Sequence, residues 1–206
     1  AAGGAGCVRY RAARMRWALF GVSVLVGCVS SHPLDPEWRR QRAVAATEAN
    51  APVLRLDWQV IGQSVEGRPL RIARLGNGPR RVLWVGGIHG DEREGHLATA
   101  ELPRAFVDTP GATAMVTLTI LEDANPDGSA ANTRTNKRGV DLNRNYPATN
   151  YLPGDGRGER PLDQPEAAAL HDLVLAERPH LVIVAHAWRG DHFINFDGPA
   201  EAERMA

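Results

Sequence analysis

The sequence predicts an α/β fold in which a largely parallel sheet is covered by helices on both faces. Continuous apolar runs at residues 81–85 and 181–184 are typical of strands buried inside such a sheet. A helical pattern at residues 165–176 precedes the second run, with Pro165 near its start and an apolar stripe along one face. Strands that alternate with helices in this way build layered sheets.

The remaining elements continue the alternation. In chain order we expect a helix at residues 36–49, strands at 54–61 and 70–75, a helix at 95–107 interrupted or bent near Pro103, and strands at 115–121 and 192–196. The segment between residues 125 and 161 is longer than most connections, so we expect it to carry function.

Composition indicates an ordinary globular domain. The 206 residues include 24 basic and 24 acidic side chains, and this balance gives no electrostatic sign of a nucleic-acid partner. Hydrophobic content of 43% and charged content of 23% exclude a disordered chain. Two cysteines are too few for a disulfide framework.

The N-terminal region has the features of an export signal. We expect translation to start at Met15. Arg16 and the apolar run 18–26 then form the charged and hydrophobic parts of a signal peptide. Residues 25–28 resemble the bacterial lipoprotein signal box, which predicts lipidation at Cys28 and a periplasmic or cell-envelope location. An ordinary signal peptide or a short hydrophobic anchor is the alternative.

A metal site is predicted where two strands end. His89 and Glu92 follow the strand 81–85 on a glycine-containing turn, at the sheet edge where sites form in α/β folds. Catalytic zinc often takes two histidines and one glutamate and keeps a fourth position open. His186 ends the strand 181–184 at the same edge and is our third ligand, with His192 as the alternative. The other histidines are interpreted as surface, packing or linker residues: His32, His96, His171 and His180.

Several blocks of sequence resemble the zinc carboxypeptidase (carboxypeptidase A-like) metallopeptidases, in the compact bacterial branch of murein peptide amidases. The blocks, in family order, are residues 64–69, 86–92, 125–147 and the end of the strand at His186 together with 196–199. The resemblance implies a three-layer α/β/α sandwich with a mixed, mainly parallel sheet. Together with the N-terminal features, it predicts three parts: upstream residues and signal peptide at 1–28, a linker and first helix at 29–50, and an incomplete catalytic domain at 51–206.

The resemblance also implies roles for single residues. His89, Glu92 and His186 match the ligands of one zinc ion that activates water, and Arg134 matches the arginine that polarises the scissile carbonyl. Three further residues match binding and orienting positions: Asn143 and Arg144, which bind a substrate carboxylate, and Asp141, which orients a zinc-bound histidine.

One part of the family's machinery has no match. The glutamate that acts as general base comes from a later strand, and no glutamate of this chain corresponds to it. We therefore expect the catalytic domain to be incomplete at its C-terminal end.

The predicted function is zinc-dependent hydrolysis of a peptide or amide bond near a free carboxylate, with cell-wall muropeptides as candidate substrates. A general C-terminal-trimming carboxypeptidase, an aspartoacylase-like deacylase and a catalytically dead zinc- and peptide-binding module are the alternatives. A membrane contact is expected only through the lipid on Cys28, and the sequence leaves the oligomeric state open.

Overall fold

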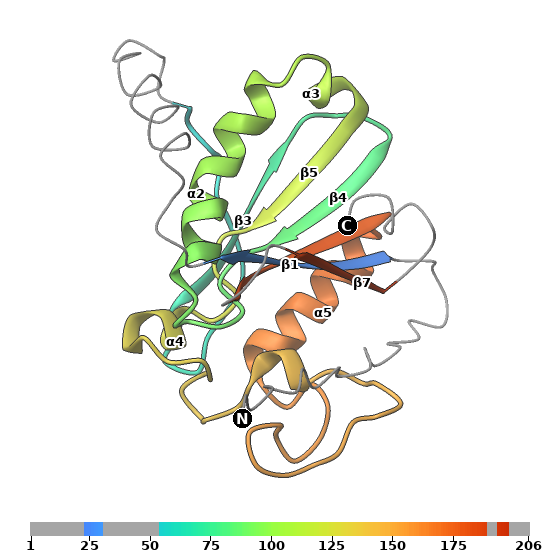
Figure 1. The fold of residues 1–206 in the computed structure, drawn as a ribbon. Helices are drawn as coiled ribbons and strands as arrows, with labels where there is room; N and C mark the ends of the chain where they lie inside the picture. Colours follow the sequence, from blue (N-terminus) through green and yellow to red (C-terminus); the bar gives the residue numbers. More distant parts are fainter. Residues whose placement is uncertain (1–22, 31–53, 189–192, 198–206) are drawn as a thin grey trace, which may run out of the picture.

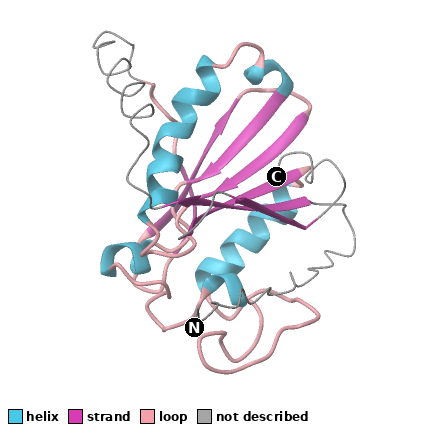
Figure 2. Ribbon diagram, in the orientation of Figure 1, coloured by secondary structure: helices cyan, strands magenta, loops and turns pink. Residues whose placement is uncertain are grey.

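The computed structural model describes residues 23–30, 54–188 and 193–197. A twisted mixed sheet with strand order β2-β3-β5-β4-β6-β1-β7 forms its centre (Figure 1; Figure 2). The first helix predicted at residues 36–49 lies outside the described residues. The α/β architecture that the sequence predicts is confirmed.

The parallel strands occupy the middle of the sheet. Strand β4 (Arg80–Val85) pairs in parallel with β5 (Val116–Leu121) on one side and with β6 (Leu181–Trp188) on the other. Their apolar runs are covered on both faces, as continuous hydrophobic strands require. Because parallel neighbours end at the same edge, the residues that follow β4 and those at the end of β6 come together there.

Antiparallel strands form one edge. Strand β3 (Pro69–Leu75) pairs with β5, and β2 (Gln59–Gln63) pairs with β3. The strand predicted at residues 54–61 is therefore wrong at its start, because pairing with β3 begins only at Gln59. Residues 54–58 alternate in exposure, but no strand of the described residues pairs with them, and alternation alone does not make a ladder.

Two helices cover opposite faces of the sheet (Figure 1). Helix α2 (Arg93–Asp108) follows β4 and runs through Pro103 as one helix, so the interruption predicted there is absent. Helix α5 (Pro165–Glu177) begins with proline at its first turn, as predicted, and precedes β6. The crossover through α2 runs from β4 to β5, and the crossover through α5 runs back from β5 to β6 on the other side of β4. Right-handed crossovers in opposite directions along a sheet place their helices on opposite faces.

Short helices interrupt the connections. Helix α3 (Ala112–Met115) leads into β5, while α4 (Pro126–Ala131) and the 3-10 helix η1 (Leu142–Arg144) lie in the segment predicted as a long loop. The signal for α4 is present in the sequence, because the Asn125 side chain accepts a hydrogen bond from the Gly128 amide and Pro126 occupies the first turn.

Two strands complete the other edge of the sheet. Strand β1 (Ser23–Ser30) pairs in parallel with β6, and β7 (Phe193–Asp197) pairs antiparallel with β1. Strand β1 overlaps the apolar end of the predicted export signal, and Cys28 lies opposite His186 in the backbone register. A short apolar run rich in valine suits either a signal peptide or a strand. Export and lipidation stay predictions.

A hydrophobic core joins the sheet to α5 and reaches the long connection between α4 and α5. It contains strand residues such as Leu83 and Val182, helix residues such as Leu170, and Leu142 of η1. The segment that contains η1 is thus attached to the main core. Among the described residues, no helix is both long enough and apolar enough to cross a membrane.

This core gives a stability prediction. Leu83 is fully buried in β4, so Leu83→Ala should lower the free energy of unfolding by about 2–5 kcal/mol. Leu97 on α2 is 56% exposed, and Leu97→Ala should change it by about 0.5 kcal/mol or less. Denaturant unfolding measures both. Equal losses for the two variants would contradict this assignment of the core.

Candidate metal centre

Neighbouring strands bring the three predicted ligands to one edge of the sheet. The β4–β6 register ends with Val85 opposite Val184, so His186 lies two residues beyond that pair. On the β4 side the chain continues through a glycine-containing turn to His89. Glu92 then occupies the residue before α2 begins, and its amide donates to the His89 carbonyl at 3.2 Å.

The turn that carries His89 needs glycine for two separate reasons. Gly87 has φ +62°, and a Cβ there would lie 2.4 Å from Asp123 Oδ1. At Gly90 a Cβ would lie 2.0 Å from the Gly128 carbonyl carbon, because the first turn of α4 packs directly against this turn. This close backbone packing holds the turn that carries His89 against α4.

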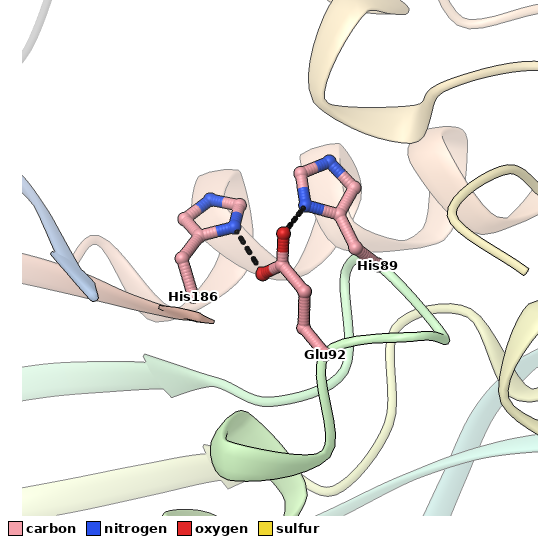
Figure 3. Close-up of side chains that lie close together, drawn as sticks. All are labelled: His89, Glu92 and His186. Carbon is pink, nitrogen blue, oxygen red and sulfur yellow. Dashed lines mark hydrogen bonds and ion pairs between the residues drawn. The ribbon is translucent and has the colours of Figure 1, made fainter. Parts of the chain in front are cut away.

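The Glu92 carboxylate joins the two histidines (Figure 3). Its Oε1 lies 2.8 Å from His89 Nδ1, and its Oε2 lies 2.9 Å from His186 Nδ1. Oε2 also accepts a hydrogen bond from the Ala187 amide at 2.9 Å. One ligand atom from each residue lies within 4.8 Å of the other two, so all three can reach a single ion.

The cluster is sheltered from solvent. His89 is 1% exposed and His186 is 4% exposed, and the two rings lie 4.6 Å apart. Within the described residues, this is the group of three histidine, cysteine or acidic side chains placed to hold a metal. Two imidazoles and one carboxylate are the donor set that hydrolytic zinc sites use.

Asp141 lies behind His89. Its Oδ1 is 3.0 Å from His89 Nε2 and also accepts the Asn143 amide at 3.0 Å. Its Oδ2 accepts a hydrogen bond from Arg134 Nε at 3.0 Å. A carboxylate at Nε2 favours the tautomer whose proton is on that nitrogen, and this leaves the Nδ1 lone pair directed at the cluster.

The charges in the cluster shift its titration. Burial opposes ionisation of Glu92, but hydrogen bonds from His186 and His89 outweigh it and lower the Glu92 pKa far below its usual value. Burial likewise opposes ionisation of Asp141, yet His89 and the nearby arginines lower its pKa to about 2. Both carboxylates are therefore anionic at neutral pH.

The two histidines respond in opposite directions. Burial lowers the pKa of His89, but the carboxylates of Asp141 and Glu92 raise it more, and the net pKa is raised. For His186, burial and the neighbouring His89 outweigh the Glu92 carboxylate, and the pKa is lowered. His186 is thus the histidine that is neutral and ready to act as a ligand over the wider pH range.

The structure also places the predicted substrate residues around the cluster. Arg134 Nη1 lies 3.3 Å from Glu92 Oε1, and Asn143 Nδ2 lies 3.5 Å from His186 Nε2. Arg144 follows Asn143, is exposed, and donates to the Asn143 carbonyl at 3.0 Å. Together with Asp141, all the described residues that the resemblance singled out meet at one site.

The histidines interpreted as structural lie elsewhere. His96 Nε2 is 3.2 Å from Ser129 Oγ, and His180 Nδ1 accepts the Arg81 amide at 3.0 Å. His32 and the alternative ligand His192 lie outside the described residues. The sequence predicts no role for two buried residues, Asn136 and Glu166. Asn136 lies inside the block 125–147 that resembles the family, and this resemblance is the signal that could have identified it.

Comparisons with known proteins agree with this geometry. Residues 44–198 match the family model described as zinc carboxypeptidase. Murein peptide amidase A of Escherichia coli strain K12 is 30% identical over 120 residues, which cover 50% of this chain and 48% of that protein. Carboxypeptidase SOL1 of Arabidopsis thaliana is 32% identical over 123 residues, covering 53% of this chain and 24% of that protein. The chain thus spans about half or less of the length of these relatives.

Solved structures show the same fold. Murein-tripeptide amidase from Escherichia coli O157 superposes with a TM-score of 0.56 at 26% identity, covering 66% of this chain and 62% of that one. Carboxypeptidase A from Helicoverpa armigera gives a TM-score of 0.59 at 20% identity, covering 65% and 41%. The family model spans well over half of the sequence, and this chain therefore belongs to the zinc carboxypeptidase family.

Proposed function

We propose that this protein is a zinc-dependent hydrolase that cleaves a peptide or amide bond close to a free carboxylate. The observation that carries the proposal is the Glu92 carboxylate held between the Nδ1 atoms of His89 and His186. Three protein donors from two strand ends leave room for a substrate atom at the same ion.

The residues fit zinc in number and kind. His89 Nδ1, His186 Nδ1 and the Glu92 carboxylate would hold it, and Asp141 would keep His89 in the tautomer that binds. When bound, zinc supplies a Lewis acid that polarises a carbonyl oxygen and makes water more acidic. Asp141 and Glu92 raise the pKa of His89 and so favour its protonated form. Zinc binds only the deprotonated Nδ1, so zinc affinity should rise with pH.

Arg134 supplies the positive charge for the reaction. Its guanidinium bonds Asp141 Oδ2 and lies beside Glu92, so it is held next to the cluster while its side chain stays 46% exposed. From there it can donate to the oxygen that becomes negative as the amide carbon turns tetrahedral. A planar guanidinium fixed in this way loses little orientational freedom during the reaction.

Asn143 and Arg144 would bind the carboxylate of the substrate. They lie in η1, next to His186 and at the exposed rim of the site. An arginine binds a carboxylate through two parallel hydrogen bonds, and the neighbouring amide adds a third donor. A substrate held there by its carboxylate places the adjacent amide bond beside the cluster.

Relatives suggest the substrate class. One is a murein peptide amidase and another a carboxypeptidase, so both a cell-wall peptide with diaminopimelate and an ordinary peptide C-terminus are candidates. We propose the cell-wall peptide. The cationic rim around Arg134 and Arg144 suits a substrate with more than one carboxylate.

A zinc- and peptide-binding protein without turnover is the second candidate. Glu92 is engaged by both histidines and is thus not free to act as the general base. The two candidates share the metal site and the carboxylate site, and they differ only in whether bound peptide is cleaved.

We expect one zinc ion per protein molecule. His89→Ala and His186→Ala should each lower zinc affinity by at least about 100-fold, because losing a ligand costs more than losing the group behind it. Competition with a chromophoric chelator measures the affinity, and His171→Ala on α5 is the control. Wild-type affinity in both ligand variants would refute the site.

The zinc-loaded protein should release diaminopimelate from a cell-wall peptide. Arg134→Lys should lower kcat by about 100- to 1000-fold, because the oxyanion loses an aligned donor. Arg144→Gln should mainly raise KM, and Arg138→Gln, in the same loop, is the matched control. Binding of the free-carboxylate peptide without any cleavage would establish the second candidate, and absence of binding would contradict both.

Asp141→Asn tests the orienting role. Since the Asp141 carboxylate raises the pKa of His89 against the effect of burial, the substitution should lower that pKa. It should also weaken zinc binding by about 10- to 100-fold. NMR titration of the His89 ring in chelator-treated protein measures the pKa, with the exposed Asp91→Asn as control. A His89 pKa that stays the same or rises would contradict this role.

A further inference from the structure

The segment from Arg134 to Arg144 carries most of the proposed substrate contacts and has little regular structure of its own. Within it, η1 is the one helical element, and the rest is turn and coil. Catalysis and binding require such groups to be held within a fraction of an ångström. Something outside the segment must therefore fix both of its ends.

Asn136 fixes the first end, two residues after Arg134. It is 3% exposed, and its Nδ2 donates to Gln164 Oε1 at 2.9 Å and to Glu166 Oε2 at 3.1 Å. Its Oδ1 accepts the amides of Arg138 and Val140 at 3.0 and 3.1 Å. Both donors and both lone pairs of the amide are thus used, which leaves it one orientation.

Asn145 fixes the second end, directly after Arg144. It is fully buried, its Oδ1 accepts the Gln164 amide at 3.2 Å, and its Nδ2 donates to Asp163 Oδ1 at 2.8 Å. Its backbone carbonyl accepts the Leu162 amide at 2.7 Å. Both ends of the segment therefore attach to the same place, the residues at the start of α5.

Glu166 lies in the first turn of α5 and links a third piece of chain. Its carboxylate is 1% exposed, and Oε1 accepts the Val65 amide at 3.0 Å while Oε2 faces Asn136. In the described part of the chain, no cation forms an ion pair with it. The helix N-terminus and the two N–H donors stabilise its charge. Each oxygen of the Glu166 carboxylate thus has a donor, and the contact from Val65 holds the other oxygen opposite Asn136.

We propose that the start of α5 acts as a clamp that positions the substrate-binding segment, with Asn136, Asn145 and Glu166 as positioning residues. This proposal rests on the proposed function, because the clamp would hold in place the residues that bind the substrate carboxylate. The metal ligands lie on the strand ends and the turn before α2, outside the clamped segment. One residue of the segment, Asp141, contacts a proposed ligand, because its Oδ1 lies 3.0 Å from His89 Nε2. Loosening the clamp should therefore affect substrate recognition most, and zinc binding only to the smaller extent that passes through Asp141.

The test is Asn136→Asp, which keeps the shape of the side chain and replaces its two N–H donors with an oxygen. That oxygen would face Glu166 Oε2 and Gln164 Oε1. Asn77→Asp, at an exposed turn between β3 and β4, is the matched control. Combining Asn136→Asp with Glu166→Gln returns a donor opposite the new carboxylate and should recover part of the effect.

Two readouts are measured on the zinc-loaded protein. The first is the ratio of affinities for one cell-wall peptide with its free carboxylate and with that carboxylate amidated. Asn136→Asp should lower this ratio about tenfold or more, while zinc affinity should fall by less than in Asp141→Asn, because Asp141 itself is kept. The second is hydrogen exchange of residues 134–144, which should become about tenfold faster or more, and the double variant should reverse both changes in part.

The outcomes separate the clamp from the proposed function. A wild-type protein that does not distinguish the two peptides contradicts the proposed function, and the exchange readout then decides the clamp alone. A folded Asn136→Asp variant with unchanged exchange overturns the clamp. A loss of zinc affinity as large as in Asp141→Asn, or a lower melting temperature with an unchanged affinity ratio, shows a general structural role and overturns it as well.

Discussion

The site depends on one carboxylate shared by two histidines. Glu92 reaches His89 within its own turn and His186 across the strand boundary, and the Ala187 amide fixes the oxygen nearest to β6. This arrangement requires β4 and β6 to be parallel neighbours that end at one edge. It also requires Gly90, since a side chain there would push the turn away from α4.

Around that carboxylate the groups form successive layers. Asp141 holds His89 from behind and binds Arg134 with its second oxygen, so the proposed metal ligands and the arginine proposed to stabilise the transition state share one support. The core continues from β4 through Leu142, which ties η1 to the sheet. The proposed substrate-binding segment is thus held by two kinds of contact: the apolar packing of Leu142 and the polar contacts at the start of α5.

Local sequence was sufficient for much of this. His89 and Glu92 are three residues apart on one turn, so their meeting is a matter of local geometry, and His186 follows from the rule that parallel strands end together. Local patterns failed where a partner was needed. Residues 54–58 alternate in exposure, but within the part of the chain that the structure describes no strand pairs with them. Strand β1 is an apolar run whose neighbours lie more than 150 residues away.

By itself, the sequence determined the family, the alternation of strands and helices, and the identities of the three metal-binding candidates, because these reside in residue types and short spacings. Only the tertiary structure decided which ring nitrogens face Glu92, that Asp141 serves both His89 and Arg134, and that Asn136 and Asn145 meet at α5. Apart from the local His89–Glu92 and Asp141–Arg134 pairs, those contacts join residues 18 to 94 positions apart. Their geometry depends on how the sheet, the helices and the long connection pack together.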